Sequence, residues 1–258
     1  MTPDNQAGAA LGGCMAFRHG ISSAQGRITG ILGAGADFYG TDVTILRWRK
    51  ARNLPSTGAG ERIYAIGDVH GRYDLLRDLL DRIGKHGRGR PHVERVRIIL
   101  LGDLIDRGPE SAQVLRLARA MQQEDPDFTV LAGNHEDVML QALDGCHDTA
   151  RMWLKYGGIA TMKSFGVEVD EEPDAIADDL AALRSALGEE MAAWLRNLPV
   201  MTRSGDYFFC HAGVRPGCPL DEQSREDLLW IRQPFLDDRR SHGAVVVHGH
   251  SITDDVDI

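Results

Sequence analysis

The chain has 258 residues, of which 43% are hydrophobic, so it is long enough to bury the core of one large domain or of two small ones. Its formal net charge of −9 argues against a general nucleic-acid partner, which would need a basic surface. The four cysteines lack metal-binding spacing and there is no apolar run long enough for a membrane span, so we expect a cytoplasmic protein with no obligate partner.

The first sixty residues differ from the rest of the chain. They are rich in Gly, Ala and Ser and show no sustained hydrophobic period, so residues 1–60 are predicted to be a low-order extension. A short basic patch, Leu46–Arg52, leaves a regulatory arm or an anionic-surface contact as weaker alternatives. Residues 61–258 are predicted to form the folded domain.

The domain begins with two strand-and-helix pairs. RIYAIGDVHG is an apolar run of strand length that ends in glycine and then presents Asp68 and His70, and an amphipathic helix follows over Tyr73–Gly87. VRIILLGDLIDRG repeats the arrangement with Asp103 and a second amphipathic helix, Ser111–Met121. The alternation of strands and helices predicts an α/β fold.

Three further apolar runs end in the same way. FTVLAGNHE presents Asn134 and His135, YFFCHAG presents His211, and AVVVHGHS presents His250. Between the third and fourth runs, residues of about 137–198 have helical spacing and are predicted to form a helical insertion that shapes access for a substrate.

The residues at these five strand ends are of the types that bind divalent metals. In open α/β folds the carboxyl ends of strands meet at one edge, so we expect one shared site. Six ligands are too many for one tetrahedral zinc but suit two ions that share a carboxylate, with Asp103 on its tight turn as the bridge. No cysteine is included, so manganese is expected, with iron or zinc as alternatives. The six are Asp68, His70, Asp103, Asn134, His211 and His250.

The motifs GDVHG, GDLIDRG, GNHE, HAG and GH together resemble the signature of the phosphoprotein phosphatase family, within the calcineurin-like metallophosphoesterases. The resemblance runs from Arg62 to the C-terminus, and WLKYGGIATMKSFG, HAGVRPG and DLLWIRQPF are similar to bacterial members. It implies an α/β (α+β) fold with a two-sheet β-sandwich flanked by helices. The family normally continues with strands beyond Ile258, so C-terminal strands are expected to be missing here. Ala132 also departs from the pattern, because many members have a basic residue there.

The resemblance also implies how the metals are divided. Asp68 and His70 would hold one ion, with Asp103 as the bridge to the second. Asn134, His211 and His250 would hold that second ion. Two such ions would lower the pKa of a water between them and so supply a hydroxide as the nucleophile.

The remaining roles come from the same resemblance. His135, paired with Asp106, would be the general acid, and its proton would go to the leaving oxygen near neutral pH. Arg107 would bind the substrate phosphate together with Asn134. Arg232 is expected to be the second phosphate-binding arginine, with Arg215 as the alternative.

Several neighbouring residues have less specific interpretations. Asp106 and Arg107 could instead form a surface ion pair. Glu136 is expected to cap the helix after GNHE or to support the site. His248 is interpreted as a supporting or packing histidine, and Cys210 as a buried core residue.

We therefore expect a metallophosphoesterase that acts as a serine/threonine protein phosphatase, with a phosphorylated protein or a small phosphoester as substrate. The main alternative is symmetrical hydrolysis of diadenosine tetraphosphate, which would use the same ions with a different pocket. A metallo-nuclease is disfavoured by GNHE, DRG and the acidic charge. A truncated, inactive remnant is suggested by the early C-terminus, and the intact ligand set counts against it.

Overall fold

The computed structural model describes residues 54–169 and 176–252, and these contain two three-stranded sheets. The first sheet is parallel throughout, in the order β1-β2-β3. In the second, β5 pairs antiparallel with β4 and parallel with β6. The mixed α/β class with two sheets is confirmed. The strands are β1 (Glu61–Ile66), β2 (Arg95–Leu100), β3 (Phe128–Val130), β4 (Met201–Ser204), β5 (Tyr207–Cys210) and β6 (Val245–Val247).

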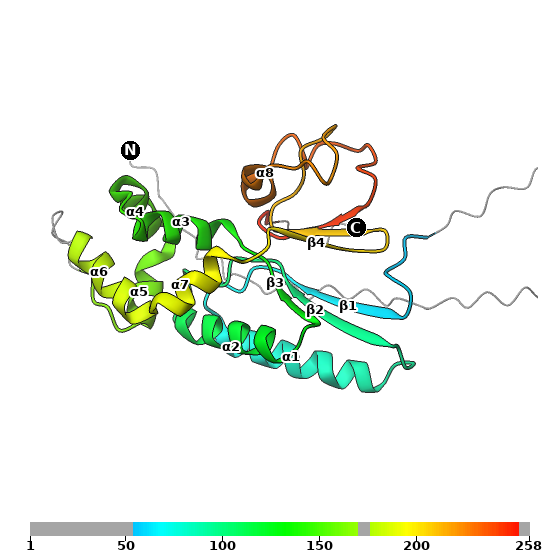
Figure 1. Cartoon of the computed structure of the whole chain (residues 1–258), viewed down its shortest axis with the longest axis horizontal. Coiled ribbons are helices and arrows are strands. Elements are labelled where there is room, and N and C mark those ends of the chain that lie inside the picture. The colour runs from blue at the N-terminus through cyan, green and yellow to red at the C-terminus, as the bar shows by residue number, and fades with distance from the viewer. Residues whose placement is uncertain (1–53, 170–175, 253–258) are drawn as a thin grey trace, which may run out of the picture. The chain divides into compact units, whose positions relative to one another are not determined.

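Two helices follow the first two strands, as the leucine spacing predicted. α1 (Tyr73–Arg88) and α2 (Ser111–Glu124) lie on one side of the first sheet (Figure 1). A helical group follows β3, and one further helix follows β5. These are α3 (Asn134–Leu143), α4 (His147–Trp153), the π-helical turn Leu154–Gly158, α5 (Ile159–Ser164), α6 (Ile176–Leu187), α7 (Glu189–Arg196) and α8 (Arg225–Trp230).

Alternate residues of a strand enter different apolar layers. Leu100 of β2 packs in the core shared with the helices, whereas Ile99 packs with Phe209 of β5 between the two sheets. Phe208 of β5 points the other way, into a cluster that includes Leu228 of α8. Only the C-terminal part of β2 is covered on both faces, so Ile99, Leu100 and Leu101 are fully buried and form a continuous apolar run, whereas Val96 at its start is 39% exposed.

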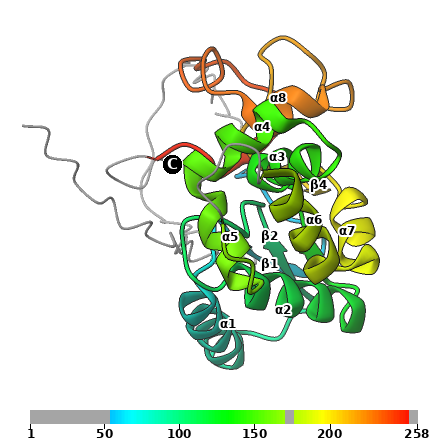
Figure 2. The ribbon, with the colours of Figure 1, turned by 90° about the vertical axis from the view of Figure 1, so that its left-hand side faces the viewer.

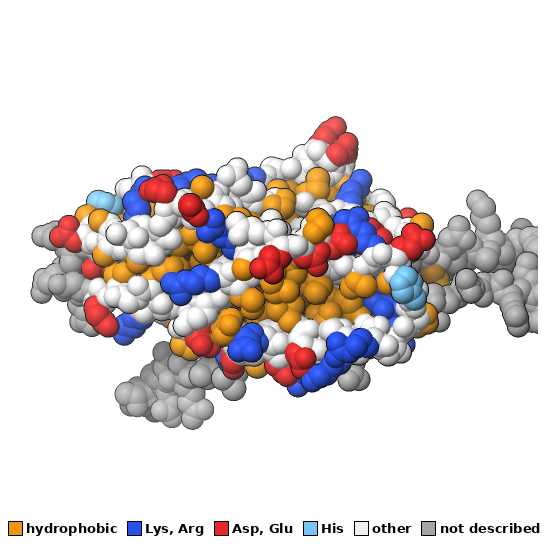
Figure 3. Space-filling model, turned by 60° about the horizontal axis from the view of Figure 1, so that its bottom comes forward, with side chains coloured by type: hydrophobic (Ala, Val, Ile, Leu, Met, Phe, Trp, Pro, Cys, Tyr) orange, Lys and Arg blue, Asp and Glu red, His pale blue; other side chains and the backbone are white. Residues whose placement is uncertain are grey.

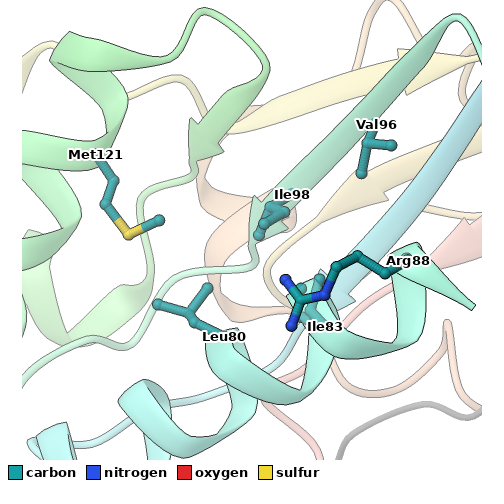
Figure 4. A pocket seen from close by; sticks show the side chains of 8 residues that line it. Leu80, Ile83, Arg88, Val96, Ile98 and Met121 are labelled. Atoms are coloured by element: carbon teal, nitrogen blue, oxygen red, sulfur yellow. The ribbon is translucent and has the colours of Figure 1, made fainter.

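The predicted apolar face of α1 is only partly covered. Leu76 is fully buried, but near the C-terminal end of the helix the side chains surround a hollow of about 370 Å³ (Figure 4). Viewed from this side, hydrophobic side chains are exposed between rows of charged ones (Figure 3). The hollow is lined by Leu80, Ile83, Gly84, Gly87, Arg88, Val96, Ile98 and Met121.

The predicted extension lies mostly outside the described residues, because 1–53 are not among them, and its interpretation stays a prediction. The linker that follows is anchored to the turn between β4 and β5. Ser56 N donates to Asp206 Oδ2 at 3.0 Å, and Gly58 N donates to Ser204 Oγ at 2.8 Å. The expectation about strands beyond the last residue likewise stays an expectation. No helix in the described ranges has the length and apolar character to cross a membrane.

Candidate metal centre

The carboxyl ends of five strands bring the predicted side chains to one place. Two groups of buried or half-buried ligand atoms form there, and they share Asp103. One group adds His70 and His135, and the other adds His211 and His250. Asp68, at the end of β1, also lies beside the first group, because its Oδ2 is 4.0 Å from His70 Nε2. Four of the predicted ligands, Asp68, His70, His211 and His250, are therefore gathered around Asp103.

His70 has the geometry of a metal ligand. Its Nδ1 lies 2.8 Å from the carbonyl oxygen of Ile105 and donates its hydrogen there, which leaves the lone pair on Nε2. This buried Nε2 has no hydrogen-bond partner among the described residues. It lies 3.8 Å from Asp103 Oδ2. Since a buried nitrogen without a partner costs free energy, the arrangement fits a cation held between the histidine and the carboxylates.

The second group is more compact. Asn134 Oδ1 lies 2.8 Å from both His211 Nε2 and His250 Nδ1, and His211 Nε2 lies 3.3 Å from Asp103 Oδ2. Two ligand atoms that are each about 2.1 Å from one ion, at right angles, are about 3 Å apart. The separations therefore fit ligands of a single ion. His211 Nδ1 is 2.9 Å from the carbonyl oxygen of Leu101, again leaving Nε2 for a metal.

The electrostatics of the second group favour a bound cation. Burial opposes the charge of Asp103, but the neighbouring histidines, His211 first, hold the pKa of this carboxyl far below its usual range. Burial likewise opposes a charged His211, yet Asp103 raises the pKa of His211 to about 9. Burial and the charge of His211 lower the pKa of His250 to about 3, so His250 stays in the neutral form that metals bind. The donor set of imidazole, carboxylate and amide suits manganese, iron or zinc.

Backbone strain in the described part of the chain is concentrated at these turns. Its non-glycine residues with left-handed φ all belong to the predicted motifs, and such a conformation costs about 1 kcal/mol or more for each. Backbone hydrogen bonds hold them in place, since Val69 N and His70 N both donate to Asp103 O at 2.9 Å. The five are His70 (45°), Asp103 (52°), Asp106 (73°), Arg107 (68°) and His250 (63°).

Two glycines let the second and third motifs touch. Gly102 has a φ of +97°, and a Cβ there would lie 2.6 Å from Gly133 Cα. Glu136 joins the same two turns, because its carboxylate accepts Gly133 N at 2.8 Å, Asp103 N at 3.0 Å and Leu104 N at 2.8 Å. Glu136 thus both caps α3 and supports the turn that carries Asp103, so the two roles considered for it occur together.

His135 and Asp106 form the predicted pair. His135 Nδ1 donates to Asp106 Oδ2 at 2.6 Å, and Asp106 is fully buried, so this aspartate does not form a surface ion pair with Arg107. Burial opposes the protonated imidazole, but the hydrogen bond to Asp106 and the charge of Asp103 raise the pKa of His135 above its ordinary value. Arg107 is exposed, and its Nη2 lies 3.3 Å from His135 Nε2.

Sequence reasoning missed two residues that hold Asp106. Trp153 Nε1 donates to Asp106 Oδ2 at 2.8 Å. Thr161 Oγ1 lies 2.5 Å from Asp106 Oδ1, to which it donates, and 2.9 Å from the backbone N of Asp106. Both belong to the stretch WLKYGGIATMKSFG, which contains the π-helical turn, and Gly157 O of that turn accepts Arg107 N at 3.2 Å. The signal in the sequence was that Trp153 and Thr161 each bring a hydrogen-bond donor into a helical stretch whose neighbouring residues are apolar.

The two candidate arginines lie in different surroundings. Arg232 is exposed at the rim of the site, and its Nη2 donates to His250 O at 3.4 Å. Arg215 forms a two-point ion pair with Asp227, with distances of 2.8 Å from Nε and 2.5 Å from Nη2. Because the fork of Arg215 is already occupied, Arg232 is the better placed of the two for a phosphate.

His248 and Cys210 lie outside the ligand groups. The ring of His248 packs edge-on against Phe235, with centroids 5.1 Å apart, which fits a packing histidine. Cys210 is fully buried, and burial raises the pKa of its thiol to about 12. Neither side chain is part of the ligand groups described above.

Comparison with known proteins identifies relatives of the domain. The model of the family described as calcineurin-like phosphoesterase matches residues 61–256. A "Bis(5'-nucleosyl)-tetraphosphatase, symmetrical" of Aromatoleum aromaticum is 34% identical over 157 residues, which are 60% of this chain and 45% of the relative. A "Serine/threonine-protein phosphatase 2" of Escherichia coli is 40% identical over 96 residues, 37% of this chain and 38% of the relative. The chain thus spans less than half the length of these curated relatives.

One solved structure matches most of this chain and most of its own length. It is described, as a provisional assignment, as a diadenosine tetraphosphatase, and it is 20% identical with a TM-score of 0.49. The match covers 76% of this chain and 80% of that one.

Proposed function

Because this chain belongs to the calcineurin-like phosphoesterase family, we propose that it is a two-metal hydrolase whose preferred substrate is a dinucleoside tetraphosphate. The observation that carries the proposal is the pair of ligand groups that share Asp103. The choice of substrate is supported by the name of the relative from Aromatoleum aromaticum, which matches a longer part of this chain than the Escherichia coli phosphatase does. This reverses the order of the two substrates expected from the motifs.

In this proposal the site would hold two divalent ions. Asp68, whose Oδ2 lies 4.0 Å from His70 Nε2, would bind one ion together with His70, and His135 of that group would stay free to act as the acid. Asp103, which belongs to both groups, would serve both ions. The second ion has the ligands Asn134, His211 and His250. Bound there, the ions would supply a nucleophile from water and neutralise the charge of the phosphoryl oxygens.

His135 acts as the general acid. Its Nδ1 proton is fixed by Asp106 at 2.6 Å, so the proton that it transfers is the one on Nε2. The raised pKa of His135 keeps a protonated fraction near neutral pH. Arg107 Nη2 lies 3.3 Å from the same Nε2, so the proposal requires the Arg107 side chain to leave this nitrogen and contact the substrate phosphate when Nε2 carries its proton.

Exposed arginines flank the ligand groups and supply positive charge for the phosphate chain. Arg107 and Arg232 both have exposed side chains, one beside His135 and the other beside His250. A chain of four phosphates carries several negative charges, so two separate guanidinium groups suit it better than a single one. We assign the two arginines to phosphate groups on either side of the bond that is cleaved.

A serine/threonine protein phosphatase is the second candidate. It is supported by the 40% identity with the Escherichia coli phosphatase, although that match covers a shorter segment. Both candidates use the same ligand groups and the same acid, so the distinction depends on the walls of the site rather than on its metals.

The test is hydrolysis by metal-free protein reloaded with manganese. Diadenosine tetraphosphate, a phosphothreonine peptide and p-nitrophenyl phosphate are offered at equal concentrations, and products are separated by anion-exchange chromatography. The proposal expects manganese-dependent conversion of diadenosine tetraphosphate to ADP alone, with a higher kcat/KM than the peptide. Preference for the peptide would select the second candidate, and no turnover of any substrate by folded, metal-loaded protein would reject both.

A further inference from the structure

A cleft lies beside the ligand groups, between α3 and α8. It has a volume of about 710 Å³, which is in the range of small-molecule sites. In Figure 2, α8 and α3 lie close together near the top of the view. The cleft is lined by Asp137, Gln141, Arg225, Glu226, Leu229 and Trp230.

Both walls of the cleft start at the candidate metal centre. Asp137 is in the first turn of α3, the helix that begins at the ligand Asn134. On the other wall, the ring of Trp230 lies 6.5 Å from the ring of His250, with the planes 78° apart. The cleft is therefore next to the ligand groups on both of its walls.

Trp230 offers an unused aromatic surface. It is 40% exposed, whereas its neighbour Leu229 is 1% exposed and fixes the end of α8 in the core. An exposed indole on an anchored helix loses little conformational freedom on binding, and its flat face suits another flat ring. A planar, mostly apolar group is the kind of ligand that this wall would bind.

The charges of the cleft argue against a second phosphate site. Among the described residues that line it, the cation is Arg225, which is already bound to Asp137, with Nη2 to Oδ1 at 3.0 Å and Nε to Oδ1 at 3.2 Å. Asp137 Oδ2 accepts Gln141 Nε2 at 2.8 Å, and Glu226 adds a further negative charge. With carboxylates outnumbering the arginine, the cleft suits an uncharged ring that carries hydrogen-bond donors, such as the amino group of a nucleobase.

We propose that the cleft between α3 and α8 binds one nucleobase of the substrate, with Trp230 stacking on the base while the phosphates lie at the metals. The assignment rests on the proposed function, because it requires a substrate with a nucleoside beside its phosphates. It also provides a physical basis for preferring a dinucleoside polyphosphate to a phosphopeptide.

The test measures binding rather than turnover. Manganese-loaded full-length protein is titrated calorimetrically with AMP and with ribose 5-phosphate, which has the same phosphate and sugar but no base. The proposal expects AMP to bind more tightly, on the order of ten-fold, as base stacking on an aromatic side chain does. Trp230→Ala should bring the ratio of the two affinities close to one, and Trp230→Phe should keep most of the difference. Leu236→Ala, an exposed apolar side chain outside the cleft, should leave it as in the wild type.

Each outcome bears on one proposal. Equal affinities for the two ligands, or a ratio that survives Trp230→Ala, would overturn the nucleobase site even if diadenosine tetraphosphate is hydrolysed. A ratio that depends on Trp230 in a protein that does not hydrolyse diadenosine tetraphosphate would support the cleft and reject the proposed function. Circular dichroism and the melting temperature of each variant show that a lost ratio does not reflect unfolding.

Discussion

The indole of Trp153 donates to Asp106 Oδ2 at 2.8 Å, and the same oxygen accepts Nδ1 of His135 at 2.6 Å. One carboxylate oxygen therefore joins the helical insertion to the candidate general acid. Because Asp106 is fully buried, its position depends on these partners and not on solvent. The helical insertion thus orients His135 through Asp106, in addition to forming part of the wall of the site.

The hydroxyl of Thr161 should matter through Asp106. We expect Thr161→Val to leave Asp106 Oδ1 without the hydroxyl that donates to it, at a cost of about 1–3 kcal/mol in the free energy of unfolding. It should also lower kcat and shift the pH profile of kcat, because Asp106, the partner of His135, is then held by fewer hydrogen bonds. Thr161→Ser keeps the hydroxyl and should retain both. Urea unfolding and a pH–rate profile measure the effects, and equal behaviour of the two variants would contradict the positioning role.

The bridging role of Asp103 predicts a metal-binding defect. Asp103→Asn removes the charge that both ligand groups share, so we expect weaker manganese binding and loss of most activity. Titration calorimetry of the metal-free protein measures the first effect and initial rates the second. Asp81→Asn, which changes an exposed carboxylate paired with Lys85 on α1, is the matched control and should bind manganese normally. Normal manganese affinity in Asp103→Asn would rule out the bridge.

The general-acid role of His135 predicts a dependence on the leaving group. His135→Asn should lower kcat while manganese stays bound, and the loss should be greater for an alkyl phosphate than for p-nitrophenyl phosphate. The alkoxide is a poor leaving group that needs a proton, whereas p-nitrophenolate leaves without one. Rates with both substrates, with His147→Asn at an exposed position as the control, measure this. The same fractional loss for both substrates would exclude proton donation by His135.

Glu136 should contribute to stability through the backbone groups that it accepts. Glu136→Gln replaces an acceptor oxygen by an amide NH₂ in a cluster of N–H donors that includes Gly133, Asp103 and Leu104. We expect a loss of about 1–3 kcal/mol in the free energy of unfolding, measured with urea. Glu190→Gln, at an exposed ion pair with Arg119, should cost at most about 1 kcal/mol. Equal stability of the two variants would mean that Glu136 is not needed at the turn.

The sequence alone determined where the ligands lie along the chain and that they meet. Each apolar run is short and ends in glycine, and the carboxyl ends of neighbouring parallel strands are adjacent, so Asp68, Asp103 and Asn134 had to be close once the strands paired. The period of the leucines likewise determined α1 and α2. Both are local patterns, because the backbone geometry of a helix or strand itself sets the direction in which each side chain points.

Only the tertiary structure decided which distant side chains complete the site. Trp153 and Thr161 are 47 and 55 residues from Asp106, and their partnership depends on the path of several helices and of the π-helical turn between them. In the same way, the pairing of Arg215 with Asp227 and the exposure of Trp230 beside His250 follow from how α8 packs. Local periodicity specifies which face a residue occupies, whereas a hydrogen bond between distant segments also requires their separation and orientation, which packing sets.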